Sequence, residues 1–453
     1  MRVAVIGSGI SGNAAAWALA QPMQPNPLKD VVLYEKRNRP GGHSHTIDID
    51  YDGRALAVDV GFIVYNTLNY PNLVALFDHL GVKTIESDMS FGVSMARSKA
   101  KGRERSGARR LEWSGNSLNT IFAQRRNFFS PTFWQMIGGI LRFNRRATAD
   151  LEAGRLKDRS LGHYLRETGF KRTFIDWYLA PMGAAIWSTP HADILDFPAE
   201  SFVRFFANHR LMHATSERPK WRTVAGGSRS YVSKITAPFQ ENIRLDSTVT
   251  AVHREGGKVH VVDQSGHHDV FDHVIFAAHT DQTLAMIKDT IPREHAVLSA
   301  IGYRANTIYL HRDPGLMPRD RKVWSAWNYI ETPDAVQAKT GVCVSYHMNA
   351  LQKIDDTCPL FVSLNPEHPP RADLTFAVTT FDHPQFDAKA LNAQRALPDI
   401  QGEGNYWYCG AWCGHGFHED GLKSGLEIAE RLGAVVPWRA ARSETEDQLE
   451  AAE

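Results

Sequence analysis

Cysteine, long apolar runs and net charge are all scarce in this sequence of 453 residues. Its four cysteines include no C-x-x-C pair, so neither a disulfide framework nor a thiolate metal site is expected, and we predict reduced thiols and no bound metal. No apolar run approaches the ~20 residues that cross a bilayer. The 51 basic and 50 acidic side chains nearly cancel, which argues against a nucleic-acid partner.

We also expect no secretory leader, because the sequence opens directly with a predicted buried strand. We therefore expect a cytoplasmic protein, either soluble or attached peripherally to the inner face of the cytoplasmic membrane. The hydrophobic share of 43% and the charged share of 22% are ordinary for globular proteins. A chain of this length is expected to form two or more domains.

The first stretch, Val3–Gly12, predicts a dinucleotide site. A short apolar run meets Gly7, Gly9 and Gly12, and small helix-compatible residues follow over 13–20. In this G-x-G-x-x-G pattern the first glycine permits a tight turn, the second lets the backbone approach a pyrophosphate, and the third lets helix pack on strand. The start of the helix then offers N–H groups and a positive dipole end to the phosphates.

An acidic residue completes the dinucleotide pattern. The apolar run Val31–Tyr34 is followed by Glu35, which lies 23 residues after Gly12, where a carboxylate that binds ribose is expected. The alternative interpretation is a β–α–β unit that binds no nucleotide. The combination of glycines, strands and acid favours the nucleotide site.

Residues 35–46, EKRNRPGGHSHT, resemble the E-x-x-x-R-x-G-G-R-x-x-[ST] signature of the superfamily of flavin amine oxidases, protoporphyrinogen oxidases and phytoene desaturases. The resemblance implies FAD rather than NAD as the cofactor. It places Glu35 on the adenosine ribose and Gly41-Gly42 close to the flavin. One departure is His43, which stands where the family usually has arginine.

A second motif near the other end of the chain resembles the same superfamily. Residues 406–429, YWYCGAWCGHGFHEDGLKSGLEIA, are predicted to form a strand, a glycine-rich loop and a helix whose positive end faces the flavin or its phosphates. The two motifs together imply these FAD-binding residues: Gly7, Gly9, Ile10, Ser11, Gly12, Glu35, Lys36, Gly41, Gly42, His43, Gly61, Val249, Ala278, Gly410, Ala411, Trp412, Glu419, Asp420 and Gly421.

The resemblance implies an α/β fold in which a Rossmann-like FAD-binding domain of the glutathione-reductase type carries an inserted α+β substrate domain. The predicted parts are the FAD-binding domain over 1–90, 216–290 and 401–438, a mostly helical cap over 91–215, the substrate-domain sheet over 291–400 and an acidic tail over 439–453.

Residues 121–146 are the predicted contact with a membrane surface. Apolar side chains at helical spacing alternate there with arginines, as in helices that lie in a membrane interface. An amphipathic helix packed on the substrate domain explains the same pattern. The basic run 97–110 is predicted to be an exposed loop. The large apolar side chains of the contact are Phe128, Phe129, Phe133, Trp134 and Ile137.

Candidate proton-handling residues come from the flavin motifs. Histidine exchanges a proton near neutral pH, and a tyrosine hydroxyl also donates and accepts. For each candidate the alternative role is a phosphate contact, a turn cap or a core hydrogen bond. The candidates are His43, His45, Tyr65, His415 and His418.

Flavin amine oxidases typically carry a lysine on a strand of the substrate domain, and the stretch that matches it here, Arg304–His311, has none. The nominated pocket residues are apolar and aromatic. They suit a lipid or terpenoid better than a cation.

Stretches spread over residues 1–438 resemble a bacterial group of FAD-binding proteins associated with cyclopropane and methylated fatty-acid metabolism: RPGGHSHT, DVGFIVYN, DMSFGVSM, GLMPRDRKVWSAWNY and GFHEDGLKSG. One branch is the desaturase of methylated phospholipid acyl chains in furan fatty acid synthesis. The resemblance implies dehydrogenation of such a phospholipid chain, with O2 or another electron acceptor. The alternatives are a flavin amine oxidase acting on a small hydrophobic amine, and a lipid-binding flavoprotein without turnover.

Overall fold

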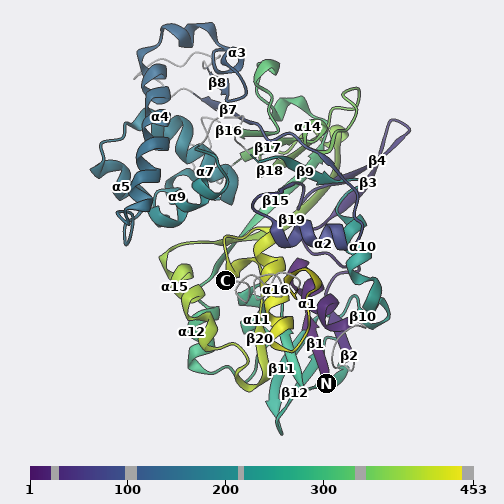
Figure 1. The fold of residues 1–453 in the computed structure, drawn as a ribbon. Coiled ribbons are helices and arrows are strands. Elements are labelled where there is room, and N and C mark those ends of the chain that lie inside the picture. Colours follow the sequence, from purple (N-terminus) through teal and green to yellow (C-terminus); the bar gives the residue numbers. More distant parts are fainter. Residues whose placement is uncertain (22–29, 97–109, 213–218, 332–342, 441–453) are drawn as a thin grey trace, which may run out of the picture.

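The computed structural model describes residues 1–21, 30–96, 110–212, 219–331 and 343–440. In this part of the chain the protein has two lobes, which are drawn one above the other in Figure 1. The lower lobe is built on a five-stranded sheet, and the upper lobe combines a seven-stranded sheet with a group of helices.

The lower sheet is parallel throughout, with the strand order β10-β2-β1-β14-β20. Its central strands are almost completely buried and apolar, as expected of parallel strands that are covered on both faces. The strands are β1 (Arg2–Ile6), β2 (Asp30–Tyr34), β10 (Ile243–Arg244), β14 (His273–Phe276) and β20 (Tyr406–Tyr408).

Two layers cover this sheet. Val3 and Val5 of β1 face a helical layer, whereas Ala4 and Ile6 face a layer made of a small antiparallel sheet and three helices. The helical layer contains α1 (Ile10–Ala20), α2 (Pro71–His79), α10 (Arg229–Thr236) and α16 (His418–Arg431). The opposite layer contains β11 (Val249–Glu255), β12 (Lys258–Asp263), β13 (His268–Phe271), α11 (Thr280–Met286), α12 (Pro292–Leu298) and α15 (Ala388–Ala396).

Glycines allow the helices of the first layer to approach each other and β1 closely. A Cβ on Gly12 would lie 1.9 Å from the carbonyl oxygen of Gly7, and a Cβ on Gly425 would lie 2.1 Å from that of Ser11. Both positions therefore need glycine for packing. The contacts bring the ends of the sequence together, because α1 and α16 lie side by side.

The upper sheet has the strand order β19-β15-β18-β17-β16-β7-β8. Its pairs are antiparallel except β16 with β7. The strands are β7 (Phe91–Ala96), β8 (Arg110–Ser114), β15 (Gly302–His311), β16 (Trp327–Ile330), β17 (Cys343–His347), β18 (Phe361–Leu364) and β19 (Thr375–Gln385).

A group of helices packs beside one edge of this sheet around buried phenylalanines such as Phe133, Phe174 and Phe202 (Figure 1). No helix of the described residues is long and apolar enough to cross a bilayer. The helices are α3 (Leu118–Ile121), η1 (Arg125–Phe129), α4 (Pro131–Glu152), α5 (Leu161–Glu167), α6 (Arg172–Phe174), a π-helical turn (Ile175–Leu179), α7 (Ala180–Trp187), α8 (His191–Ile194) and α9 (Ala199–Asn208).

Shorter elements connect the lobes. The hairpin of β3 and β4 packs with the upper sheet, and a three-stranded ribbon has the order β5-β9-β6. These elements are β3 (Thr46–Tyr51), β4 (Arg54–Asp59), β5 (Tyr65–Asn66), β6 (Thr84–Glu86), β9 (Trp221–Val224) and α14 (Met348–Gln352).

Two predicted ranges contain elements that pack elsewhere in the structure, and two predicted stretches lie mostly outside the described residues. The range 91–215 also contains β7 and β8, which complete the upper sheet. The range 291–400 contains α12 and α15, which pack in the lower lobe, because their apolar faces cover the parallel sheet. The basic run over 97–109 and the tail from 441 lie outside the described residues.

Candidate active site

The loop between β1 and α1 has the geometry that an anion-binding turn requires. Gly7 has a φ of 105°, a conformation that favours glycine, and a Cβ there would clash with Ala277. No side chain caps the start of α1. At Gly9 an added Cβ would meet no atom within 4 Å, so this side of the loop faces open space. The open side lets a pyrophosphate lie against the helix start.

Glu35 follows β2 and turns its buried carboxylate toward this loop. Its Oε2 accepts hydrogen bonds from the backbone and hydroxyl of Ser8, and its Oε1 accepts one from the Arg37 N–H at 2.9 Å. Glu35 lines the same cavity as Gly9. The carboxylate is therefore held rigidly where the sequence pattern expects a ribose.

A cavity of about 790 Å³ extends from the glycine loop to the upper sheet. At one end it is lined by Glu35, Val249 and the loop, and at the other by side chains of the cap and the upper sheet. The predicted residues that line it are Gly7, Gly9, Ile10, Ser11, Glu35, Lys36, Gly42, His43, Gly61, Val249, Ala278, Gly410, Ala411, Trp412, His415 and His418. The structure thus brings motifs from both ends of the chain to one cavity.

Glu419 and Asp420, predicted to bind FAD, do not line the cavity. The Glu419 carboxylate accepts hydrogen bonds from the backbone N–H groups of Asn72 and Leu73 at the start of α2. The Asp420 carboxylate accepts hydrogen bonds from two backbone N–H groups that precede α16. Both acids stabilise helix starts, and this capping replaces the predicted cofactor contact.

Four further predicted residues stand behind the lining. Gly12 and Gly421 are packing positions; a Cβ on Gly421 would lie 2.8 Å from Ile10. Gly41 has a φ of 110° and donates its N–H to Ser8, so it shapes the turn before Gly42. Tyr65, a predicted proton handler, is buried against Tyr70 and Phe77 and does not reach the cavity, which makes it a packing residue.

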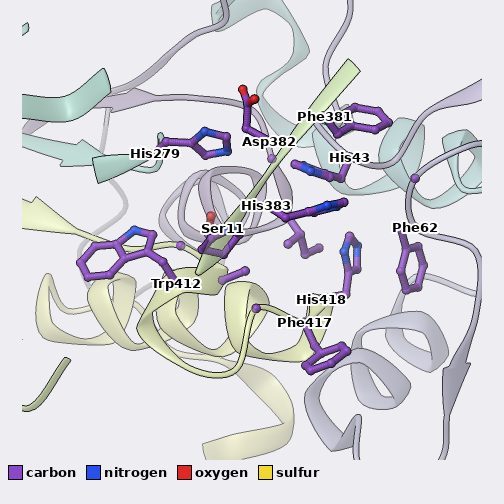
Figure 2. A pocket seen from close by; sticks show the side chains of 18 of the residues that line it. Ser11, His43, Phe62, His279, Phe381, Asp382, His383, Trp412, Phe417 and His418 are labelled. Carbon is purple, nitrogen blue, oxygen red and sulfur yellow. The ribbon is translucent and has the colours of Figure 1, made fainter. Parts of the chain in front are cut away.

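Three histidines from distant segments meet beside the cavity. His43 lies between Phe381 and His383, as Figure 2 shows. Its ring stacks on that of Phe381, with the centroids 4.5 Å apart, and its centroid lies 5.5 Å from that of His383. His279 is 6.4 Å from His43 and stacks on Tyr303. Sequence reasoning found His43 but missed the other two. His279 does follow a predicted strand of the lower sheet, and that position was the one available signal.

His383 is oriented by two linked amide side chains, of which Asn306 is buried. Asn365 donates a hydrogen bond of 2.7 Å to the Oδ1 of Asn306, and the Nδ2 of Asn306 lies 2.8 Å from the Nδ1 of His383. Because an amide nitrogen is only a donor, Nδ1 is the acceptor and the ring proton is on Nε2. These two hydrogen bonds therefore fix one neutral tautomer of His383.

His418 has its own partners at the start of α16. Its ring stacks on Phe62 at 3.8 Å, and its Nε2 lies 2.7 Å from the hydroxyl of Tyr231, which in turn contacts Ser44. His415, by contrast, lies near Phe205 with its ring at 6.2 Å. His45 is half-buried, and its Nδ1 has no hydrogen-bond partner among the described residues.

Burial keeps the cavity histidines neutral. Desolvation lowers the pKa of His383 to about 4 and that of His418 to about 3. Desolvation, with a further effect of His383 and His279, holds the pKa of His43 well below its usual value. At neutral pH these rings are therefore neutral imidazoles and add no positive charge to the cavity.

The far end of the cavity is apolar and aromatic. Phe205 of α9 stacks on His209 at 3.9 Å and on Phe417 at 4.9 Å, and Trp187 at the end of α7 lies 4.8 Å from Phe205. The other apolar lining residues there are Ile63, Val64, Met89, Ile186, Leu211, Ile308, Trp327, Tyr346, Val362, Leu364 and Phe386.

Two features of the lining fit a bound dinucleotide with a ring system. The indole N–H group of Trp412 is buried and has no hydrogen-bond partner among the described residues, although Trp412 lines the cavity. A Cβ on Gly42 would lie 2.9 Å from the Cα of Gly9, so only glycine lets the two loops meet. Unpaired buried donors of this kind are typical of ligand sites.

Comparisons with known proteins agree with this architecture. A family model described as an NAD(P)-binding Rossmann-like domain matches residues 5–80. The chain is similar in structure to a CLA-producing fatty acid isomerase from P. acnes, at 15% identity and a TM-score of 0.64, covering 95% of this chain and 98% of that one. No curated protein matches the sequence.

Two oxidases are similar to the same degree. A putrescine oxidase bound to putrescine shows 16% identity and a TM-score of 0.63, over 95% of this chain and 99% of that one. Cyclohexylamine oxidase from Brevibacterium oxydans IH-35A shows 15% identity and a TM-score of 0.62, over the same shares of the two chains. The predicted fold, a Rossmann-like domain with an inserted substrate domain as in flavin amine oxidases, is confirmed.

Proposed function

We propose that this protein is a FAD-dependent oxidoreductase that dehydrogenates a lipid, namely a methylated fatty acyl chain of a phospholipid. The observation that carries the proposal is the single cavity lined by the glycine loop and Glu35 at one end and by apolar and aromatic side chains at the other. The shared fold of a fatty acid isomerase and of amine oxidases fits this class of enzyme.

The residues of the lower lobe would hold FAD without a covalent bond. The start of α1 would hold the pyrophosphate, Glu35 would accept hydrogen bonds from the adenosine ribose, and the Trp412 indole N–H would donate to a polar atom of the cofactor. Cys409 and Cys413 do not line the cavity, so neither thiol is placed to form a thioether. When bound there, the flavin supplies the acceptor for a hydride.

His383 and His43 have different roles in removing the substrate proton. The Nε2 of His383 carries the ring proton and is a hydrogen-bond donor, because its Nδ1 accepts a hydrogen bond from Asn306. His43 is neutral, and no described group forms a hydrogen bond with its ring, so its lone pair is available to accept a proton from the carbon next to the one that loses hydride. In this proposal His43 is the base and His383 is a positioning donor.

The lining favours a neutral chain over an ammonium group. Among the described lining residues, Glu35 and Asp382 are the only carboxylates, and Glu35 belongs to the nucleotide end. A protonated amine that is buried in an apolar site needs a counter-charge. The carboxylate of Asp382 would provide this counter-charge, and its place in the lining favours the second candidate, oxidation of a small hydrophobic amine.

A phospholipid chain must be taken from a bilayer, and we propose that the outer face of the cap provides the contact. The side chain of Phe129 is 82% exposed, and those of Phe128 and Trp134 are also exposed. Arg125 and Arg126 lie in the same short helix, η1, as the two phenylalanines. We name Leu118, Phe128, Phe129 and Trp134, with these two arginines, the cap patch.

The cap patch corrects the predicted membrane contact in two positions. Phe133 is fully buried and Ile137 packs against the cap core, so neither faces outward. The exposed group fits an anionic lipid surface, because aromatic side chains enter the interface and arginines attract the headgroups. The same group of helices carries the cap patch and part of the cavity wall. Trp134 of the patch belongs to α4, which packs on α9, and Phe205 of α9 lines the cavity.

Anaerobic reduction of the bound flavin tests the substrate class. A phospholipid with a methyl-branched acyl chain is expected to bleach the flavin absorbance in a single turnover, whereas cyclohexylamine leaves it unchanged. Bleaching by the amine alone would support the second candidate, oxidation of a small hydrophobic amine. Failure of both, with flavin bound, would support a lipid-binding flavoprotein without turnover.

A further inference from the structure

The outer face of the three-stranded sheet β11-β12-β13 carries a cluster of histidines that the proposed reaction does not use. Val252, Val259 and Phe271 point inward and pack on the parallel sheet. Side chains alternate along a strand, so His253 and His260 point to the opposite face. Glu255 and His268 share that outward face with them.

The strand register places these side chains next to each other. His253 of β11 pairs directly with His260 of β12, and their rings stack at 5.0 Å. Glu255 follows His253 by two residues and therefore lies on the same face. His260 stacks on His268 of β13, also at 5.0 Å. Two adjacent β-strands thus present two imidazoles and a carboxylate as one group.

The ligand atoms converge at distances that suit a metal ion. The Oε2 of Glu255 lies 3.6 Å from the Nε2 of His253 and 3.9 Å from the Nε2 of His260. A tetrahedral ion with bonds of ~2.0–2.2 Å separates its ligands by roughly 3.3–3.6 Å, so small side-chain rotations complete the coordination. In the described part of the chain no other group of three such residues has its ligand atoms within 4.8 Å of one another.

A supporting hydrogen bond prepares His260 for coordination. The Nδ1 of His260 lies 2.9 Å from the Nε2 of His268. When His260 donates this bond, its proton is on Nδ1 and the Nε2 that faces Glu255 has a free lone pair. Histidine ligands of metals regularly donate their second ring N–H in this way, which fixes the ring and its tautomer.

Although the sequence alone predicts no bound metal, we propose that His253, Glu255 and His260 bind one divalent transition-metal ion of the zinc type, with water in the fourth position and His268 as the supporting residue. Two imidazoles select zinc, copper or nickel over magnesium, which prefers oxygen ligands. Because its ligands come from two strands, the ion joins β11 to β12. β11 begins at Val249, which lines the cavity, so the site supports the strand that forms this part of the wall.

Calorimetric titration of the tag-free, flavin-loaded protein with Zn²⁺ tests the proposal. One ion per chain is expected to bind, and Mg²⁺ is expected not to compete. The double variant His253→Ala/His260→Ala should lose the site, and His268→Ala should weaken it about tenfold. His295→Ala, at an exposed position of α12, is the matched control and should bind like the parent.

Thermal unfolding provides a second measurement on the same samples. Zn²⁺ is expected to raise the midpoint of the parent and of His295→Ala, and to leave that of the double variant unchanged, because a ligand of the folded state stabilises it. Absence of binding by the parent would overturn the proposal. Equal binding by the double variant would also overturn it, since the metal would then occupy another place.

Discussion

At the scale of single residues, the glycines of the nucleotide loop have two different tasks. Gly12 and Gly425 are surrounded by backbone, and any side chain there would collide at about 2 Å. Gly9 faces open space instead. The sequence pattern assigns the approach to the pyrophosphate to Gly9 and the packing of helix on strand to Gly12, and the surroundings of the two glycines in the structure agree with it. This difference decides which substitution is informative.

Gly9→Val is expected to give a folded protein that has lost its flavin, because the valine methyl groups enter the space of the pyrophosphate. Flavin per chain after purification measures the effect, and Gly302→Val is the control, since a Cβ there also meets no atom within 4 Å. Glu35→Gln, which removes a charged acceptor worth ~1.5–3 kcal/mol, should weaken FAD binding by roughly ten- to a hundredfold. Normal flavin content in Gly9→Val would contradict the assignment of the cavity.

Asn306→Asp is expected to change the pH profile of flavin reduction. The new carboxylate accepts a hydrogen bond from a protonated Nδ1 of His383, so the pKa of this histidine should rise from its depressed value of about 4 toward neutral pH. A protonated His383 lowers the basicity of the neighbouring His43, so the rate should fall on the acidic side at a higher pH than in the parent. Asn306→Ala removes the donor without adding charge and should slow the reaction without moving the profile.

Flavin content and the thermal midpoint serve as structural controls for both Asn306 variants. If neither the rate nor the pH profile changes while both controls stay normal, His383 does not act at the reacting centre.

The histidine cluster shows where prediction from single residues ends. His43 was identified because it replaces an arginine within a recognisable motif. His383 lies on β19 and His279 just before α11, and no local pattern relates them to His43. Their meeting depends on how β19 lies against the loop after β2, which is a tertiary contact. The capping of α2 by Glu419 was unpredictable for the same reason.

At the scale of elements, helical spacing predicted a helix within 121–146 but assigned the wrong outward face to part of it. Ser130 caps α4 by accepting from the N–H of Phe133, and Pro131 starts the helix. This start directs Phe133 into the cap core and leaves Trp134 outside. Helical periodicity predicts that α4 has an apolar face, whereas its packing against α6 and α9 decides which residues that face contains.

Phe128→Ser/Phe129→Ser is expected to weaken binding to anionic liposomes at least tenfold, because each exposed aromatic side chain contributes ~1.5–3 kcal/mol when it enters the interface. Liposome flotation measures the effect, and raised salt should weaken the binding of the parent through screening of the arginines. Val378→Ser, at an exposed apolar residue of β19, is the matched control.

Phe133→Ser should differ from the double variant by lowering the free energy of unfolding by roughly 3–5 kcal/mol, as expected for a large cavity in a core. Flotation of the double variant equal to that of the parent would show that the cap patch is not the membrane contact.

At the scale of the whole molecule, buried histidines make stability depend on pH. His311 is enclosed in the upper lobe, where its Nδ1 accepts from the N–H of Asp313 and its Nε2 bonds to Ser363. Burial lowers its pKa to about 4. The unfolded chain binds a proton near pH 6.5 and the folded chain does not, so stability is highest above pH 6.5 and is lost as the pH falls toward 4.

The parent is therefore expected to lose about 2 kcal/mol more than His311→Gln between pH 7 and pH 5. Urea unfolding at the two pH values measures this difference. Asp59, whose burial raises its pKa to about 6, has the opposite effect, but it is present in both proteins and cancels in the comparison. Equal losses in parent and variant would show that His311 is protonated in the folded protein.

The overall architecture was predictable because two motifs, one at each end of the chain, occur in a recognisable order. The structure explains why both are needed: α16 covers α1, and Gly425 lies against Ser11. The composition of the upper sheet was less predictable, because β7 and β8 come from a segment that is otherwise helical. Strand order depends on distant pairing, which local patterns do not record.

The central claim is that the apolar end of the cavity takes an acyl chain and that the protein removes hydrogen from it. Mass spectrometry of the lipid after a single anaerobic turnover tests this claim most directly. The account predicts that the methyl-branched phospholipid loses two hydrogen atoms, with one product molecule for each flavin reduced. Recovery of the lipid unchanged, while a hydrophobic amine reduces the flavin and is oxidised, would contradict it.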